Sequence, residues 1–503
     1  MERSFHCYAQ TTNGRVNTLS FLIRAVVMGT FATKIVCTVG PASSSTDTMC
    51  QMIKAGMNVA RVNLSHGNRS THKSLIDAVR KSSSITHTPV GLLLDLPGPR
   101  IRVGKIRKSS IVLERGARVT LSPGNFEGTQ DIIPVDYDDV ASEVSPGDDI
   151  SLANGLITLK VDRVKGNDVI CRVVVGGLLF SRKGVNIPSR SLKLPAITDV
   201  DKTHIRFGIE AGADFFAVSF VRGPDDVRVA KDLIHDNKSN AMVIAKIEKA
   251  EGFRRLKEIL EVADGIMVAR GDLGVELPIE KTPIIQKRII EECNNAGKPV
   301  ITATQMLMSM VNSPTPTRAE VTDIANAVLD GTDAVMLSEE TAVGSYPIQA
   351  VKVMSKIVQE AENAIDHRAV IRKHRENLEP GIGEALSLSA VELALNINAA
   401  AVVAPTRSGL TARRISRYRC SQPILALTGD ENVARQLLIS WGVIPIMCRT
   451  LKTAEAIFRK SEEIVLKNKY GKIGDQIIVA AGSPTSPKGR TDIIRVLTLG
   501  KLQ

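Results

Sequence analysis

The chain has 503 residues, of which 43% are hydrophobic and 23% are charged, and this composition excludes a largely disordered or collagen-like polypeptide. Lys and Arg total 65 against 53 Asp and Glu, so the formal net charge is +12. A net positive charge is compatible with binding to nucleic acid, to acidic lipid or to small anionic substrates, and the charge alone does not distinguish among these partners. The length alone predicts about three domains.

The seven cysteines are widely spaced and form no Cys-x-x-Cys or Cys/His cluster, so neither a disulfide framework nor a zinc site is predicted. This pattern favours a reducing compartment, and we expect a cytoplasmic protein. No apolar run reaches the roughly 20 residues that cross a bilayer, which argues against a membrane protein. Residues 1–27 are predicted to be an N-terminal extension. We expect a disordered tail, or an upstream start with Met28 as the natural initiator, rather than a targeting segment.

Eight short runs of β-branched and aliphatic residues recur along the chain, and most are followed by a helical pattern. The runs span 34–37, 58–64, 90–94, 215–220, 242–247, 265–269, 299–303 and 334–337. Such runs alternating with amphipathic helices are typical of parallel strands joined by crossover helices. Eight units predict an α/β fold with a closed (β/α)8 TIM barrel over 28–103 and 192–365. Thr317 and Glu320 form a capping box that predicts a helix over 318–329.

Two segments do not follow this alternation of single strands and helices. Between 104 and 191, polar–apolar alternation with Pro-Gly and Gly-Asp turns predicts strands at 110–113, 117–121, 149–152, 156–161 and 169–175. We expect a small β-barrel lid domain there, inserted after the third barrel strand. Apolar runs at 401–404, 424–427, 443–447 and 476–480 predict a C-terminal α/β domain over 366–503, joined through the polar stretch 366–383.

Polar side chains follow seven of the eight barrel runs, where the strands are expected to end. They are Arg61, Asn63, Ser65, Asp95, Ser219, Lys246, Glu248, Arg270, Asp272, Thr304, Ser338 and Glu340. The functional groups of a TIM barrel gather at the carboxyl ends of its strands. For any single residue of this set, an ordinary strand cap is the alternative.

Lys246 and Glu248 are two positions apart, so on a strand both side chains project to the same side. Glu248 and Asp272 follow adjacent strands, and two converging carboxylates suit Mg²⁺ or Mn²⁺ better than zinc. A Lys–Glu ion pair without metal is the alternative. A divalent cation beside Lys and Arg is typical of phosphoryl transfer. Gly271 and Gly274 leave backbone N–H groups bare at a predicted helix start, where a substrate carboxylate could bind.

Common nucleotide signatures are absent from the sequence, which contains no Walker A motif, no kinase glycine-rich loop and no G-x-G-x-x-G after a strand. Six longer motifs instead resemble the pyruvate kinase family. They are TKIVCTVGPA (33–42), MNVARVNLSHG (57–67), KIE (246–248), DGIMVARGDLG (264–274), GKPVITATQML (297–307) and PTRAEVTDIANAVLDG (316–331). The resemblance extends over about 33–500 and includes the inserted and terminal domains.

The resemblance implies transfer of a phosphoryl group from phosphoenolpyruvate to ADP, giving pyruvate and ATP in glycolysis, with a divalent metal and a homotetrameric assembly. It implies that Lys246 and Arg61 act on the phosphoryl group and that Glu248 and Asp272 ligate the metal. The substrate would also contact Ser219, Gly271, Asp272 and Thr304, while Thr304 and Ser338 would position the water that protonates carbon. The nucleotide would be faced by Asn63, His66, Arg102 and Lys183. A turn role is the alternative for His66.

The sequence departs from the family after the third strand. Arg100 replaces the Glu that accompanies a potassium requirement, and Leu96 replaces the Thr that binds the ion. A fixed guanidinium charge repels a second cation, so we predict that activity does not need K⁺. A solvated surface arginine is the alternative. Pro97, Glu339 and Val343 also differ from the residues usual in the family, and these differences predict weaker or altered contacts with ADP. We also expect the insert to close over the nucleotide as a lid that excludes water.

A loop of the terminal domain contains Thr406, Ser408, Gly409 and Thr411 between a predicted strand and a predicted helix. Hydroxyls, a glycine and helix N–H groups suit a phosphate, and the loop resembles the family's effector loop. It predicts allosteric control by a phosphorylated sugar or nucleotide, with a plain strand–helix turn as the alternative.

Two other function classes stay open at this point. A metal-dependent TIM-barrel lyase or aldolase that handles enolpyruvate would need similar groups but not ADP. A basic nucleic-acid-binding protein would exploit the +12 charge, although aromatic residues make up only 3% and no RRM, KH or helix-turn-helix signature occurs.

Overall fold

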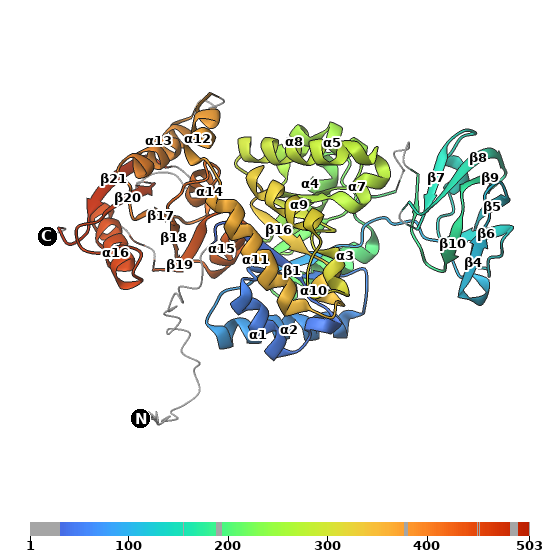
Figure 1. Ribbon diagram of the computed structural model, residues 1–503, viewed down its shortest axis with the longest axis horizontal. Coiled ribbons are helices and arrows are strands. Elements are labelled where there is room, and N and C mark those ends of the chain that lie inside the picture. The colour runs from blue at the N-terminus through green and yellow to red at the C-terminus, as the bar shows by residue number, and fades with distance from the viewer. Residues whose placement is uncertain are drawn as a thin grey trace, which may run out of the picture.

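The computed structural model describes residues 31–153, 155–187, 194–376, 381–449, 451, 453–482 and 491–501. The N-terminal extension expected over 1–27, and the start at Met28, lie outside these residues. A central barrel carries the insert on one side and the C-terminal α/β domain on the other (Figure 1). Among the described residues no helix is both long and apolar enough to cross a bilayer.

Eight parallel strands close the barrel in the order β1-β16-β15-β14-β13-β12-β3-β2, which confirms the predicted TIM barrel. The strands are β1 (Lys34–Thr38), β2 (Val59–Asn63), β3 (Gly91–Asp95), β12 (Phe215–Val218), β13 (Met242–Ile247), β14 (Gly265–Ala269), β15 (Val300–Ala303) and β16 (Ala334–Leu337). Their residues are almost all buried because helices cover the outside and side chains fill the inside. Every predicted run contains a strand, although several predicted runs extend beyond the observed strand or are displaced from it by one residue.

The helices of the barrel follow their strands and shield them. They are α1 (Thr46–Ala55), α2 (Arg69–Thr86), α3 (Asp199–Glu210), α4 (Pro224–Asp236), α5 (Ala250–Arg254), α6 (Leu256–Val262), α7 (Arg270–Glu276), α8 (Thr282–Asn295), α9 (Arg318–Leu329), α10 (Glu339–Ala342) and α11 (Pro347–Asn363). The Thr317–Glu320 capping box at the start of α9 is confirmed, with the Glu320 N–H donating to the Thr317 hydroxyl at 3.3 Å.

The insert leaves the barrel after β3 and returns before α3, as predicted. It contains β4 (Ser110–Leu113), β5 (Arg118–Pro123), β6 (Ile132–Val135), β7 (Asp149–Leu152), β8 (Ile157–Lys165), β9 (Asp168–Val175), β10 (Gly177–Phe180) and β11 (Val185–Asn186). Six of these form one sheet in the order β11-β7-β8-β9-β5-β6, and β10 pairs with β4. Its apolar core is separate from that of the barrel. Strands β6, β10 and β11 were not predicted from the sequence.

The C-terminal domain is a five-stranded sheet in the order β19-β18-β17-β20-β21, flanked by helices. Its elements are α12 (His367–Glu376), α13 (Ile382–Asn396), β17 (Ala401–Pro405), α14 (Leu410–Ser416), β18 (Ile424–Thr428), α15 (Glu431–Gln436), β19 (Val443–Met447), α16 (Ala454–Lys467), β20 (Gln476–Ala481) and β21 (Ile493–Thr498). The antiparallel edge strand β21 was not predicted. The polar joint expected over 366–383 contains the helix α12, which was not predicted.

The C-terminal domain closes the amino end of the barrel, opposite the carboxyl ends of the strands. Leu438 and Ile439 pack in one apolar cluster with the barrel strands. Arg435 pairs with Asp214, just before β12, at 2.7 Å, and Arg419 pairs with Asp333, just before β16, at 2.9 Å. These contacts leave the carboxyl ends of the strands to the insert and the solvent.

His374 on α12 gives a testable pH dependence. Its side chain is buried edge-on against Tyr418, and burial, reinforced by Arg417 and Arg419, lowers the pKa of His374 to about 4. Because the unfolded state binds this proton near the usual pKa of 6.5, stability should fall by up to about 3 kcal/mol as the pH falls from 7 to 4. Denaturant unfolding of His374→Gln should show a shallower loss over this range, and an unchanged pH profile would contradict the assignment.

Candidate active site

Lys246 lies in β13, at the carboxyl end of the barrel, and is the centre of a buried polar cluster. Its Nζ atom lies 2.7 Å from Ser219 Oγ, 2.9 Å from Glu248 Oε1 and 3.1 Å from Asp95 Oδ1. Burial by itself would lower the pKa of Lys246, but Asp95 and Glu248 outweigh it and hold the pKa above its ordinary value. The ammonium therefore stays charged throughout the physiological pH range.

Asp95 ends β3 and joins Lys246 to a second cation. Arg61 Nε donates to Asp95 Oδ2 at 2.7 Å, and Arg61 Nη1 donates to Thr38 Oγ1 at 2.7 Å. Burial would raise the pKa of Asp95, but Lys246 and Arg61 outweigh it and keep the pKa below its ordinary value. One buried carboxylate thus fixes two positive groups at the mouth of the barrel.

Glu248 and Asp272 form the candidate metal site. Glu248 Oε2 accepts the N–H of Phe220 at 2.7 Å while Oε1 pairs with Lys246, so the carboxylate is fixed in position. Burial, with Asp272 and Asp95 adding repulsion, raises the pKa of Glu248 despite the opposing ammonium of Lys246. Electrostatic repulsion between two carboxylates is relieved by a bound cation, and oxygen ligands suit Mg²⁺ or Mn²⁺. Within the described ranges no cluster of three or more His, Cys, Asp or Glu side chains forms a metal cage.

The residues that follow β12 and β15 adopt backbone conformations that are uncommon for residues other than glycine. Phe220 has φ +57°, and Thr304 and Gln305 have φ +69° and +55°. In the first case the strained turn presents the N–H of Phe220 to Glu248. Such strain persists only where the surrounding structure enforces it, and it is concentrated at functional sites.

Thr304 and Gly271 face each other across the ends of β15 and β14. The Gly271 N–H donates to Thr304 Oγ1 at 2.9 Å, and Thr304 Oγ1 donates to the Ala303 carbonyl at 2.6 Å. A side-chain carbon on Gly271 would meet Thr304 at 3.6 Å, an ordinary van der Waals contact, so packing against Thr304 does not by itself require a glycine. In this structure the Gly271 N–H has a protein partner, and a substrate carboxylate would have to share or displace it.

Ser338 and Glu340 lie at the end of β16. The Ser338 N–H donates to Glu340 Oε2 at 2.6 Å, and the Leu307 N–H donates to Glu340 Oε1 at 3.0 Å. Glu340 is fully buried and acts as a cap for two loops, which was the alternative stated for the strand-end residues. Ser338 remains partly exposed at the rim.

Arg270 also has a structural role. Its Nη1 atom donates to Asp323 at 2.6 and 2.7 Å, and its Nη2 atom donates to the Thr304 carbonyl at 2.7 Å. These contacts hold the loop that contains Thr304 in position. Arg270 is therefore a positioning residue in this site.

Of the residues expected to face a nucleotide, His66 and Arg102 have other arginines nearby. Burial and the charges of Arg102, Arg100 and Arg61 lower the pKa of His66, which places these arginines around the imidazole. The Val103 N–H donates to the Lys183 carbonyl at 2.8 Å, which places Lys183 beside Arg102 across the root of the insert. Asn63 Oδ1 accepts the Ser65 N–H at 3.1 Å and so also stabilises its own turn.

The positions that depart from the family have different surroundings, and of these Arg100 and Glu339 act on His66. Leu96 is 1% exposed and packs into the barrel core. The guanidinium of Arg100 lies beside Gly184 of the insert, where a side-chain carbon would meet its Nε at 3.3 Å. Val343 and Glu339 are exposed at the end of β16.

The candidate effector loop lies in the other domain, away from this site. Thr406 Oγ1 accepts the Gly409 N–H at 2.9 Å, and Gly409 has φ +80°. Thr411 is buried and its hydroxyl lies 2.9 Å from that of Thr491. Two hydroxyls of the loop, those of Thr406 and Thr411, therefore already have partners within the protein, as the turn alternative requires.

Asp95 was noted as a strand-end residue, but no site role was predicted for it. A buried pair next to the site, Lys249 and Glu276 at 3.0 Å, was also missed. Burial raises the pKa of Glu276, and electrostatic repulsion from Asp272 adds to this shift. The only signal for Asp95 was its place after an aliphatic run. Nothing local in the sequence indicated the Lys249–Glu276 contact.

Comparison with known proteins agrees with this geometry. Residues 31–351 match the family model described as pyruvate kinase, barrel domain, and residues 384–497 match pyruvate kinase, alpha/beta domain. The chain belongs to the pyruvate kinase family. It is a phosphotransferase of the glycolytic type.

Several named pyruvate kinases are similar over most of their length. That of Sporosarcina psychrophila is 45% identical over 476 residues, covering 93% of this chain and 81% of the relative. That of Clostridium acetobutylicum is 43% identical over 466 residues, covering 92% and 98%. A crystal structure of a pyruvate kinase from Cryptosporidium parvum matches with a TM-score of 0.89 and 36% identity, covering 93% of this chain and 96% of that one.

Proposed function

We propose that this pyruvate kinase transfers the phosphoryl group of phosphoenolpyruvate to ADP at the carboxyl end of the barrel. The observation that carries the assignment of the site is the ammonium of Lys246, fixed between Asp95, Ser219 and Glu248. In the reaction the bond between phosphorus and the enol oxygen breaks and a bond to a terminal ADP oxygen forms. Lys246 and Arg61 neutralise the charge on the transferring group.

The enolate left behind takes a proton at carbon to become pyruvate. A threonine hydroxyl is too weak an acid to supply this proton unaided, so a water held near Thr304 and Ser338 delivers it. The Gly271 and Ala303 contacts fix the Thr304 hydroxyl for this relay. Ser219, Gly271 and Asp272 complete the substrate pocket.

Glu248 and Asp272 hold the divalent cation, Mg²⁺ or Mn²⁺, in this proposal. When bound, the cation would supply positive charge that neutralises the negative charge of the substrate. Lys246 and the Phe220 N–H orient Glu248 for that task. Asn63, His66, Arg102 and Lys183 contact the nucleotide, and the insert excludes water as a lid.

The reaction is tested by coupling pyruvate formation to phosphoenolpyruvate with and without ADP and Mg²⁺. Turnover should require all three. Turnover without ADP would instead indicate a lyase, and steep salt-dependent binding of polynucleotides without turnover would indicate a nucleic-acid-binding protein.

Activity is expected to be independent of potassium. Arg100 puts a fixed charge beside His66 and Arg102, and buried Leu96 offers no oxygen to the ion. Adding KCl to K⁺-free assays at constant ionic strength should change kcat/KM less than about twofold, because a second cation at this place is repelled. The double variant Leu96→Thr/Arg100→Glu should gain activation by K⁺, with Arg100→Glu alone as its control. A gain of about tenfold or more in the wild type would contradict the prediction.

We also propose that Thr406, Ser408, Gly409 and Thr411 bind the phosphate of a phosphorylated sugar or nucleotide that regulates a cytoplasmic homotetramer. The αL turn at Gly409 and the start of α14 support this assignment. Sugar phosphates and nucleotides should change the KM for phosphoenolpyruvate in the wild type and not in Thr411→Ala. Identical responses would count against the loop.

A further inference from the structure

Asp201 is a fully buried carboxylate at the point where the chain returns from the insert to the barrel. It lies in the first turn of α3, and its Oδ2 atom accepts hydrogen bonds from the Thr198 N–H at 2.9 Å and the Thr198 hydroxyl at 2.6 Å. Its Oδ1 atom accepts the Gly98 N–H at 3.1 Å. Gly98 belongs to the other connection, where the chain leaves β3 for the insert. One carboxylate therefore holds both connections of the insert at the barrel.

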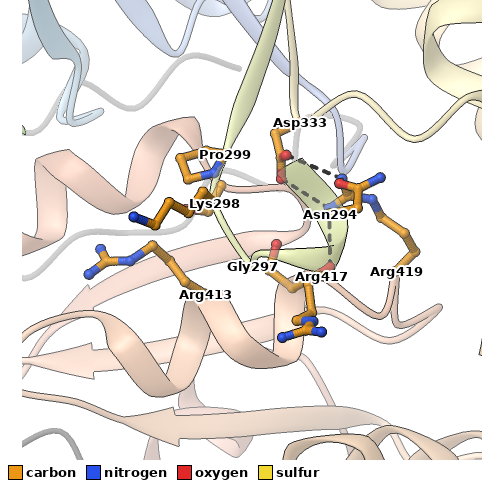
Figure 2. Close-up of a pocket in the computed structure, with 10 residues that line it drawn as sticks. Asn294, Gly297, Lys298, Pro299, Asp333, Arg413, Arg417 and Arg419 are labelled. Atoms are coloured by element: carbon orange, nitrogen blue, oxygen red, sulfur yellow. Dashed lines mark hydrogen bonds and ion pairs between the residues drawn. The ribbon is translucent and has the colours of Figure 1, made fainter. Parts of the chain in front are cut away.

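The charge of Asp201 has no ion-pair partner among the described residues. The buried carboxylate of Asp333, at the amino end of the barrel, is by contrast paired with Arg419 at 2.9 Å (Figure 2). Asp201 has only the neutral donors of Thr198 and Gly98. Burying a charge without a counter-ion costs free energy, and a helix cap does not need to be buried to work. The burial of Asp201 therefore indicates a role in addition to capping α3.

The segment that contains Gly98 packs against the turn after β12. The Leu96 N–H donates to the Ala217 carbonyl at 3.0 Å, and the Ser219 hydroxyl donates to the Leu96 carbonyl at 2.8 Å. Gly98 has φ +65°, and a side-chain carbon on it would lie 2.9 Å from Ser219 Cβ and 3.1 Å from a ring carbon of Phe220. Both the positive φ and this close approach require a glycine.

The turn after β12 carries two groups of the catalytic cluster. Ser219 Oγ accepts a hydrogen bond from Lys246 Nζ at 2.7 Å, and the Phe220 N–H donates to Glu248 Oε2 at 2.7 Å. Phe220 has φ +57°, a conformation that persists only where the surrounding structure enforces it. The segment that contains Gly98 is in direct contact with this turn and is part of that surrounding structure.

We propose that Asp201 is a positioning residue for phosphoryl transfer. By holding Gly98, it keeps the start of the insert connection against the turn after β12, and this turn fixes Lys246 and Glu248. The inference rests on the proposed function, because it takes Lys246 and Glu248 as the groups that act on the substrate. Asp201 acts only through these contacts, which link the attachment of the insert to the geometry of the catalytic cluster.

Asp201→Asn tests this role with little change in the shape of the side chain. The carboxylate offers one oxygen to each connection, whereas an amide has a single oxygen, so its NH2 group must face the N–H of either Gly98 or Thr198. We expect kcat to fall about tenfold, with a smaller change in the KM for phosphoenolpyruvate. Hydrogen–deuterium exchange measured by mass spectrometry should become faster in peptides that cover 217–222, because their turn loses support.

Thr198→Val is the matched control for helix capping. It removes the hydroxyl that caps α3 but leaves the contact between Asp201 and the Gly98 N–H intact. It should lower the Tm, as Asp201→Asn does, but kcat and the exchange rate of 217–222 should stay within about twofold of the wild type. Equal losses of kcat in Thr198→Val and Asp201→Asn would show that Asp201 is a helix cap and would overturn the proposal.

Gly98→Ala tests the same link without altering Asp201, so it does not depend on the folding of the Asp201 variant. The added methyl group would lie 2.9 Å from Ser219 Cβ, and we expect lower kcat and faster exchange in 217–222. Both effects in Asp201→Asn and Gly98→Ala, and neither in Thr198→Val, support the proposal. Unchanged kcat and exchange in Gly98→Ala would overturn it. A wild type that forms no pyruvate would contradict the proposed function instead, and the exchange rates would still test the contact.

Discussion

Replacing Lys246 with Met is expected to lower kcat about 10³-fold, with a smaller change in the KM for phosphoenolpyruvate. The ammonium is buried and lies within 3.1 Å of Asp95, Ser219 and Glu248, and its raised pKa keeps it charged. Methionine has a similar length but carries no charge, so the charge on the transferring phosphoryl group would lose its main protein counter-charge. Steady-state kinetics with pyruvate formation as the readout measure the effect.

Lys231→Met is the matched control, because Lys231 on α4 forms a single ion pair with Asp264 and is 37% exposed. It should retain wild-type kinetics within about twofold, since exposed ion pairs contribute little. Lys246→Met should also unfold at a lower denaturant concentration, because two buried carboxylates lose a partner. A Lys246→Met enzyme with kcat within tenfold of the wild type would remove Lys246 from the chemistry.

Glu248→Gln is expected to raise the Mg²⁺ concentration for half-maximal activity at least tenfold and to lower kcat about 100-fold. The substitution keeps the shape of the side chain but removes one of the two carboxylate charges at the metal site. The loss is direct because Asp272 is then the only carboxylate left at the proposed metal site, while Asp95 still pairs with Lys246. Titration with Mn²⁺, followed by electron paramagnetic resonance, measures cation binding separately from turnover.

Glu258→Gln serves as the control for this change. Glu258 is exposed and pairs only locally with Arg255 at 2.6 Å, so its loss should leave both cation binding and kcat unchanged. If Glu248→Gln kept wild-type Mn²⁺ affinity, the Lys246–Glu248 contact would be a plain ion pair and the metal would have to bind elsewhere. Loss of turnover with unchanged Mn²⁺ affinity would therefore separate catalysis from metal binding.

The periodicity of the sequence was sufficient for the barrel because each βα unit is a local signal. Lys246 and Glu248 are two residues apart, and their contact at 2.9 Å follows from strand geometry and spacing. The capping box of α9 was predictable for the same reason, because Thr317 and Glu320 are only three residues apart. The short insert strands β6 and β11 carry too few alternating residues for a pattern, and α12 contains enough charged residues to resemble a linker.

Local patterns along the chain are enough to predict the number and type of the βα units, the order of the domains and the side chains available for phosphoryl transfer. Which of these side chains meet depends on how the chain folds in three dimensions. Asp95 contacts Arg61 across 34 residues and Lys246 across 151, and Arg419 reaches Asp333 across 86. These contacts arise because the barrel closes and the C-terminal domain covers its amino end. Pairs brought together by closure leave no periodic signal along the chain, so their partners cannot be predicted from local pattern.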